Sequence, residues 1–184
     1  MRNTFDRFNG RHQDYQAARP SYAQEFLDWL GELYAPPERY TAADIGSGTG
    51  KLSAQLLAAG FRVCGVEPNP DMRGAAEALL GGDPRFSSSN GTDHDTGLPD
   101  RSVDMVAAAQ AFHWFDGPAF ARECRRILRP GGRAVLVWNV RGSAPMNQAL
   151  AQVFREHCPS FHGFTGGMGE DDPRIRDFFG GAYE

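Results

Sequence analysis

Three glycines separated by single residues follow a short apolar stretch of the chain. They lie in Asp-Ile-Gly-Ser-Gly-Thr-Gly, which covers residues 44–50. Glycine allows a sharp backbone turn and the close approach of a ligand, because it has no Cβ that would collide with either. We expect this loop to join a strand to a helix. Its backbone N–H groups should then point into the crevice at the carboxyl end of a sheet, where such folds bind ligands.

A carboxylate follows the glycine loop at a spacing that suggests a shared ligand. Glu67 ends the next apolar stretch, in Gly-Val-Glu-Pro-Asn at residues 65–69. An acidic residue about 20 positions beyond such a loop can accept hydrogen bonds from both ribose hydroxyls of an adenosine. The alternative is that Glu67 only caps the helix that follows. We favour ribose binding, since loop and acid occur together.

Two other glycine-rich motifs fit this loop less well. A P-loop needs Ser or Thr after its Gly-Lys pair, but Leu52 follows Gly50-Lys51, and Ile45 occupies the position of the first glycine. A dinucleotide fingerprint needs a third glycine where the chain has Lys51, although variants of that fingerprint exist. A nicotinamide-dependent oxidoreductase therefore stays an alternative, disfavoured also because no catalytic tyrosine–lysine pair is recognisable.

One histidine lies in an aromatic segment that could face an acceptor. The segment Gln-Ala-Phe-His-Trp-Phe covers residues 110–115, after an apolar strand, and should lie at the mouth of the crevice. His113 is the candidate catalytic base, because a neutral imidazole accepts a proton near pH 7. Phe112, Trp114 and Phe115 could form the wall of an apolar acceptor pocket. The alternative, which we favour for His113, is that His113 and Trp114 pack the loop beneath the next helix.

Other chemistries find little support in the sequence. The remaining histidines show no metal-ligand spacing, no serine lies in a G-x-S-x-G elbow, and no cysteine has a visible activating partner. The net charge of -4 argues against a surface built for nucleic acid. Three cysteines without paired spacing, and no apolar run long enough for a signal peptide or membrane span, favour a cytoplasmic protein.

Helix and strand patterns alternate along most of the chain. Apolar residues from Tyr22 to Leu33 recur at helical spacing. Strands are expected at residues 40–45, 61–66, 85–88, 103–109 and 133–140, and helices at 49–59, 70–80, 118–128 and 144–156. Pro-Gly-Gly at residues 130–132 should form a turn before the last strand. This rhythm predicts an α/β fold with a doubly wound, mostly parallel sheet covered on both faces.

The motifs together resemble a known enzyme family. Asp-Ile-Gly-Ser-Gly-Thr-Gly followed by Val-Glu-Pro-Asn resembles the first two motifs of the class I S-adenosylmethionine-dependent methyltransferases. The branch is similar to the type 11 small-molecule methyltransferases, including trans-aconitate methyltransferase-like proteins. Matching segments supporting this branch cover residues 15–22, 98–104, 109–115 and 128–132. The resemblance extends from about Tyr15 to Asn139 and implies a Rossmann-like fold.

The resemblance implies a binding site for S-adenosylmethionine. Gly46, Ser47 and Gly48 would pass beneath its methionine portion, with Asp44 supporting the loop, and Glu67 would hold the ribose. Asp93 is the candidate for the adenine amino group, although the family commonly has acid, alanine and glutamate in this segment. The other implied cofactor-binding residues are Tyr15, Arg19, Pro68, Met72, Thr92 and Gln110. Tyr15 and Arg19 would close over the cofactor. Arg19 could pair with the cofactor carboxylate, and a surface ion pair is the alternative.

The pattern departs from the family after the fifth strand. The family sheet normally ends in an antiparallel hairpin, whereas residues 159–184 are rich in Gly and Pro, and residues 174–183 could hold at most one short strand. We therefore expect the last two family strands to be missing. The fifth strand would then be an uncovered apolar edge, which invites a homodimer or aggregation.

These observations predict one methyltransferase domain over residues 1–184. It would consist of an N-terminal cap segment and helix (1–39), a cofactor-binding core (40–140), and a helix with an irregular tail (141–184). The expected function is methyl transfer to a small organic acceptor, with neither nucleic acid nor membrane as partner. A protein that binds the cofactor without transferring a methyl group is an alternative.

Overall fold

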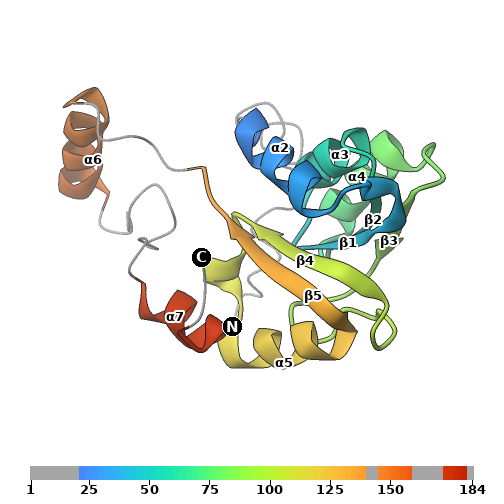
Figure 1. Cartoon of the computed structure of the whole chain (residues 1–184). Helices are drawn as coiled ribbons and strands as arrows, with labels where there is room; N and C mark the ends of the chain where they lie inside the picture. Colours follow the sequence, from blue (N-terminus) through green and yellow to red (C-terminus); the bar gives the residue numbers. More distant parts are fainter. Residues whose placement is uncertain (1–20, 140–144, 159–171, 182–184) are drawn as a thin grey trace.

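The computed structural model contains one five-stranded sheet in which all neighbouring strands are parallel (Figure 1). It describes residues 21–139, 145–158 and 172–181. The strands lie in the order β3-β2-β1-β4-β5, so the chain reverses its direction across the sheet between β1 and β4. The strands are β1 (Thr41–Ile45), β2 (Arg62–Val66), β3 (Phe86–Ser89), β4 (Val103–Ala109) and β5 (Leu128–Val137). The expected α/β Rossmann-like fold is confirmed.

The helices alternate with these strands as predicted. They are α2 (Gln24–Leu33), α3 (Lys51–Ala58), α4 (Pro70–Leu80), α5 (Gly117–Ile127), α6 (Pro145–His157) and α7 (Pro173–Phe179), with short 3-10 turns η2 (Pro37–Arg39) and η3 (Phe112–Trp114). The ends of α4 follow from local chemistry. The Asn69 side chain accepts hydrogen bonds from the Asp71 and Met72 N–H groups, and Pro70 supplies a first helical residue that needs no N–H partner.

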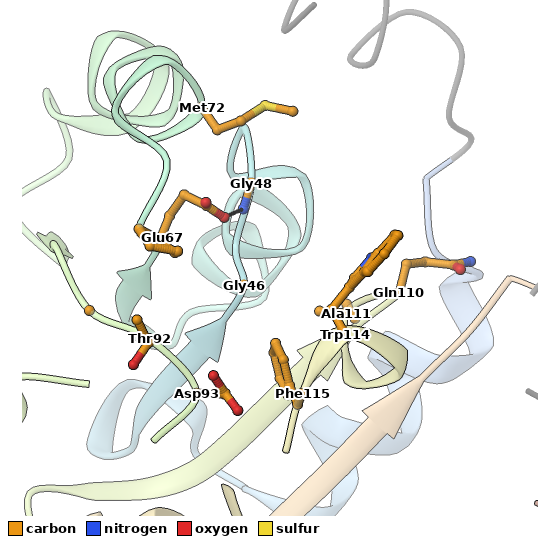
Figure 2. A pocket seen from close by; sticks show the side chains of 13 residues that line it. Gly46, Gly48, Glu67, Met72, Thr92, Asp93, Gln110, Ala111, Trp114 and Phe115 are labelled. Atoms are coloured by element: carbon orange, nitrogen blue, oxygen red, sulfur yellow. Dashed lines mark hydrogen bonds between the residues drawn. The ribbon is translucent and has the colours of Figure 1, made fainter. Parts of the chain in front are cut away.

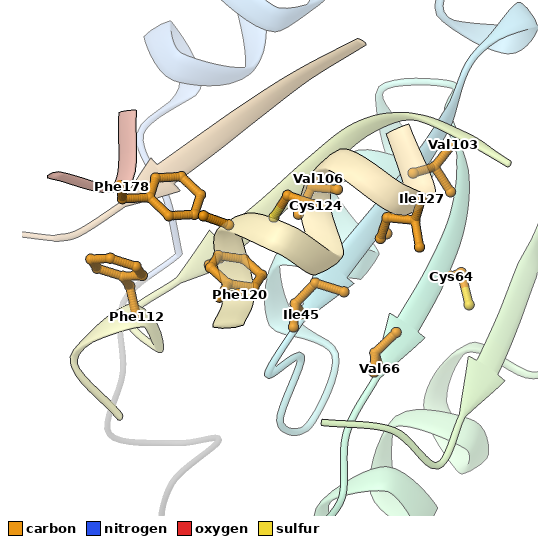
Figure 3. Close-up of a cluster of buried hydrophobic side chains, with 13 residues drawn as sticks. Ile45, Cys64, Val66, Val103, Val106, Phe112, Phe120, Cys124, Ile127 and Phe178 are labelled. Carbon is orange, nitrogen blue, oxygen red and sulfur yellow. The ribbon is translucent and has the colours of Figure 1, made fainter. Parts of the chain in front are cut away.

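Helices cover both faces of the sheet. On one face, Leu30 of α2 and Leu56 of α3 pack with Phe61 and Met105. On the other, Phe120 and Ile127 of α5 pack against the sheet together with Phe178 of α7 (Figure 3). Because helices cover both faces, the central strands β1 and β4 are buried along almost their whole length.

The last strand begins earlier than the sequence predicts. β5 starts at Leu128, opposite Val103, whereas Arg133 already pairs with Met105. The four residues between Leu128 and Arg133 therefore form an irregularity inside the ladder. The expected Pro-Gly-Gly turn survives there, with Gly131 at φ 82°. β5 ends at Val137, so Trp138 and Asn139, which were expected in the strand, lie after it, and residue 140 lies outside the described residues.

The tail holds a helix instead of the short strand that residues 174–183 were expected to allow. The Asp172 side chain accepts a hydrogen bond from the Arg174 N–H, Pro173 opens the helix, and Gly180 ends it with φ 64°. Phe178 packs against α5 with its ring stacked on Phe120 at a centroid distance of 5.2 Å. At most one short strand was expected here from the sequence, and the helix was not predicted, because these start and stop signals were overlooked.

β5 forms an edge of the sheet as far as the described residues show, since it pairs only with β4. Its side chains are partly covered, because Leu136 packs on the α5 side and Val135 on the other, and Trp138, just after the strand, also packs on the α5 side. None of the helices in the described ranges is long and apolar enough to cross a membrane.

Candidate functional site

A pocket opens at the carboxyl ends of β1, β2 and β4, where the strand order reverses. Ligands of open α/β sheets bind at this place, because the loops on either side of the reversal diverge. The pocket holds about 860 Å³ of empty space, part of it open to solvent. It is lined by Gly46, Gly48, Glu67, Pro68, Met72, Gly91, Thr92, Asp93, Ala109, Gln110, Ala111, Trp114 and Phe115 (Figure 2).

The glycine loop forms part of the wall of this pocket. Gly46 and Gly48 adopt φ values of 70° and 56°, which disfavour other residues. A Cβ at Gly46 would lie 2.8 Å from the Ala111 Cβ, whereas one at Gly48 would meet no atom within 4 Å. The loop therefore needs glycine at position 46 for close packing, and leaves open space beside position 48.

The N–H groups of this loop bond to the end of β2. Those of Gly46 and Ser47 both donate to the Val66 carbonyl, at 2.9 and 3.2 Å. The Gly48 N–H donates to Glu67 Oε2 at 2.9 Å. These three N–H groups therefore have acceptors at the end of β2, and the acceptor of Gly48, Glu67, lines the pocket. Beside Gly48 the loop also leaves space for a ligand.

Glu67 is buried with its carboxylate against the loop. Its Oε1 accepts from the Asn69 N–H at 2.8 Å, and its Oε2 accepts from Gly48. Burial raises the pKa of Glu67, and the hydrogen bonds from Asn69 and Gly48 oppose that rise. Because Asn69 caps α4, Glu67 is not the cap of that helix. A carboxylate has about four acceptor sites, so two backbone donors leave capacity for a ligand diol.

Asp44 and Ser47 lie behind the loop and not in the pocket wall. Asp44 is buried, and the Ser53 hydroxyl of α3 donates to its Oδ2 at 2.7 Å. Burial raises the pKa of Asp44 to about 6, against hydrogen bonds from Ser53. The Ser47 hydroxyl approaches Gly65 of β2. Asp44 thus bonds to α3, its support of the loop stays a prediction, and Ser47 is not among the lining residues.

A slot lies between the loops after β2 and β3. Pro68 and Met72 line one side, and Gly91, Thr92 and Asp93 line the other. Asp93 Oδ2 accepts from the Asp116 N–H at 3.0 Å, and its Oδ1 lies 3.1 Å from His94 Nδ1. Gly91 was not predicted, although a glycine two residues after the end of β3 was a signal that could have suggested it.

The mouth of the pocket is formed by the segment after β4. Gln110 has φ 55°, its N–H donates to the Val137 carbonyl at 2.8 Å, and its side chain donates to the Asn139 carbonyl at 3.2 Å. Trp114, which is 47% exposed, and Phe115 line the wall as expected. The small residues Ala109 and Ala111 beside Gln110 also line it, and they were not singled out from the sequence.

Two residues of this segment lie elsewhere. Phe112, expected in the acceptor wall, is 2% exposed and packs in the core against Phe178, because the 3-10 turn directs it inward. His113 is not among the lining residues, and its ring lies 4.8 Å from that of Trp114. Its role as a base stays a prediction. Tyr15 and Arg19 lie outside the described residues.

The fold and the pocket define a class: a Rossmann-like protein with a nucleoside-type site at the switch point of its sheet. Comparison with known proteins specifies the family. The profile of the type 11 methyltransferase domain matches residues 43–136, which is half of the chain. The chain belongs to this family of class I methyltransferases, whose methyl donor is S-adenosylmethionine.

Relatives and solved structures agree with this assignment. An uncharacterized methyltransferase of Mycobacterium tuberculosis is 42% identical over 127 residues, which are 69% of this chain and 49% of that protein. A methyltransferase-like protein of Schizosaccharomyces pombe is 32% identical over 80% of this chain and 59% of its own length. The chain spans about half the length of the curated relatives it matches.

Two solved structures share the fold. A candidate type II methyltransferase from Anaeromyxobacter dehalogenans has a TM-score of 0.58 and 33% identity, over 89% of this chain and 64% of its own. A candidate methyltransferase from an antibiotic biosynthesis pathway of Anabaena variabilis has a TM-score of 0.66 and 25% identity, over 87% and 61%.

Proposed function

We propose that this protein transfers a methyl group from S-adenosylmethionine to a small organic acceptor. The observation that supports this most directly is the Glu67 carboxylate, held by the Gly48 N–H at the edge of an open pocket. A buried carboxylate beside backbone that carries no side chain suits a ribose diol, because the sugar can approach and its hydroxyls find a strong acceptor.

The residues present fit this cofactor. Gly48 leaves room beside the loop, and Pro68 and Met72 offer an apolar side for an adenine ring facing Thr92 and Asp93. The ionisable residues among the lining residues in the described part of the chain, Glu67 and Asp93, are both acidic. An acidic pocket favours a cationic sulfonium. When bound, the cofactor supplies an activated methyl group.

The chain itself contributes position and exclusion of water. Trp114 and Phe115 form an apolar wall near Ala111, where the acceptor would lie against the glycine loop. Holding the acceptor atom in line with the methyl group supplies much of the rate enhancement. A base is needed only for acceptors that must lose a proton, and His113, beside Trp114, is the candidate for that role.

The acceptor class is proposed on two grounds. The segments around residues 15–22 and 109–115 resemble trans-aconitate methyltransferase-like proteins, which belong to the small-molecule branch. The net charge of -4 also favours a small molecule over nucleic acid.

The unpaired cysteines Cys64, Cys124 and Cys158 support a reducing, cytoplasmic setting.

Calorimetry with S-adenosylhomocysteine tests the cofactor site, with NAD as the competing ligand. We expect the protein to bind S-adenosylhomocysteine and not NAD. Glu67→Gln should bind S-adenosylhomocysteine about 10- to 100-fold more weakly, because the substitution removes a charged hydrogen-bond acceptor. Glu77→Gln is the matched control, because Glu77 lies on the exposed side of α4. Equal affinity of wild type and Glu67→Gln would remove the ribose assignment.

A screen of small acceptors for release of S-adenosylhomocysteine tests the transfer itself. Turnover with an organic acceptor supports an enzyme. Tight cofactor binding without turnover on any acceptor class would favour a cofactor-binding protein instead.

A further inference from the structure

The pocket wall after β3 packs against a buried residue, Thr96. A Cβ at Gly91 would lie 2.5 Å from the Thr96 carbonyl oxygen, so Gly91 is pressed between the pocket and the Thr96 backbone. The Ser89 hydroxyl donates to that same oxygen at 2.8 Å. The intervening turn is closed by the Thr92 N–H, which donates to the Asp95 carbonyl at 2.8 Å. The position of residues 91–93 therefore depends on where Thr96 lies.

Thr96 is in turn fixed to α5 by Glu123. The backbone N–H and the hydroxyl of Thr96 both donate to Glu123 Oε1, at 3.0 and 2.6 Å. Arg126 donates to the same carboxylate from Nε at 2.8 Å and from Nη2 at 2.6 Å. Arg126 also reaches Asp100, at the far end of the same loop, at 2.7 Å.

The carboxylate of Glu123 is buried and charged. Burial opposes its ionisation, but the hydrogen bonds from Arg126 and Thr96 lower the pKa of Glu123 to about 2. A charged acceptor makes shorter and stronger hydrogen bonds than a neutral one. Thr96, with 0% exposure, can thus be held rigidly although it belongs to a loop.

The loop meets α5 at a second point. Asp93 accepts from the N–H of Asp116, which is the cap of α5 and follows the pocket residue Phe115. Two helical turns later, Glu123 holds Thr96. One helix therefore sets the distance between the loop after β3 and the aromatic wall of the pocket.

We propose that Glu123 is a positioning residue of the ligand site. Acting through Thr96, it holds residues 91–93 where Thr92 and Asp93 can meet the edge of an adenine ring. This inference rests on the proposed function, because it assumes that an adenosyl group occupies the slot. Glu123 itself touches no ligand.

The test compares S-adenosylhomocysteine with S-inosylhomocysteine, which carries an oxygen in place of the adenine amino group. We expect the wild-type full chain to prefer the adenine compound. Thr96→Val removes the hydroxyl at nearly constant volume and should lower affinity for S-adenosylhomocysteine on the order of tenfold, with less effect on the inosine compound. Thr96→Ser should restore the preference, because it keeps the hydroxyl.

Glu123→Gln should behave like Thr96→Val, and Arg122→Gln, an exposed change on the same helix, should behave like wild type. If Glu123→Gln fails to fold, the comparison of Thr96→Val with Thr96→Ser tests the positioning role. Failure of wild type to bind either compound would refute the proposed function. Wild-type binding without base preference, or the same preference in Thr96→Val as in wild type, would overturn only the positioning role. The positioning role would also be overturned if Thr96→Ser lost as much affinity for S-adenosylhomocysteine as Thr96→Val.

Discussion

The carboxylate of Glu67 lies 2.9 Å from the backbone nitrogen of Gly48, 19 residues earlier in the chain. This contact joins the ends of β1 and β2 at the point where the pocket opens. The glycine loop and the acid, which are separate signals in the sequence, therefore belong to one site. The loop and the acid should therefore respond to mutation as a unit.

The two pocket glycines should differ in their tolerance of a methyl group. Both have positive φ, so alanine costs about 1 kcal/mol of backbone strain at either position. Gly46→Ala also overpacks against Ala111 and should lower the free energy of unfolding by about 3 kcal/mol, against about 1 kcal/mol for Gly48→Ala. Urea denaturation measures both. Equal losses would show that the close packing at Gly46 relaxes without cost.

Asp44 should make stability depend on pH in a defined direction. Below pH 3.8 the carboxyl is protonated in the folded and the unfolded chain. Between 3.8 and about 6 the unfolded chain releases the proton while the folded chain keeps it. The stability contribution of Asp44 therefore falls as pH rises through this window, by about 3 kcal/mol in total.

Asp44→Asn lacks this titration. Its free energy of unfolding relative to wild type should therefore rise between pH 4 and pH 7, which denaturant titrations at several pH values measure. A difference that stays constant over that range would mean that Asp44 titrates alike in both states.

Trp114 should report ligand binding by its fluorescence. It is 47% exposed and lines the pocket, so a bound ligand changes the solvent around its ring. Adding S-adenosylhomocysteine should change the emission of wild type, and Trp114→Phe should lose most of that change with little loss of stability. Trp29→Phe is the control, because Trp29 lies on α2 outside the pocket lining. A signal that persists in Trp114→Phe would place the ligand elsewhere.

The outer edge of β5 should support self-association. An apolar strand edge without a neighbour exposes backbone groups that pair readily with a second chain. Sedimentation velocity should therefore show a dimer, or larger species, whose share grows with protein concentration. A single monomeric species across the whole concentration range would contradict this expectation.

The sequence predicted most of the sheet and the centre of the site because both depend on local patterns. The bounds of α4 and β4 were predicted to the residue, since capping residues and apolar runs mark them. The glycine loop and Glu67 were predicted to serve one ligand, because both follow parallel strands at the same edge of the sheet, whereas the hydrogen bond between Glu67 and Gly48 was not predicted. The β5 start was missed, because a bulge beside Pro-Gly-Gly depends on pairing with β4.

Other features could not be read from local sequence. The direction of Phe112 is set by packing against Phe178, a residue far away in the chain. The burial of Glu123 depends on Thr96 in a different element. Such contacts are tertiary, and neither composition nor periodicity near either residue signals them.

The pairing of β1 with β4 has a consequence for synthesis of the chain. Ala43 lies opposite Val106, so the glycine bend leaves the ribosome about 60 residues before the strand that completes its pocket. A nascent chain that ends before β4 has no wall at Ala111 or Phe115, and should not yet retain a nucleoside. We therefore expect ligand capture only after β4 has paired with β1.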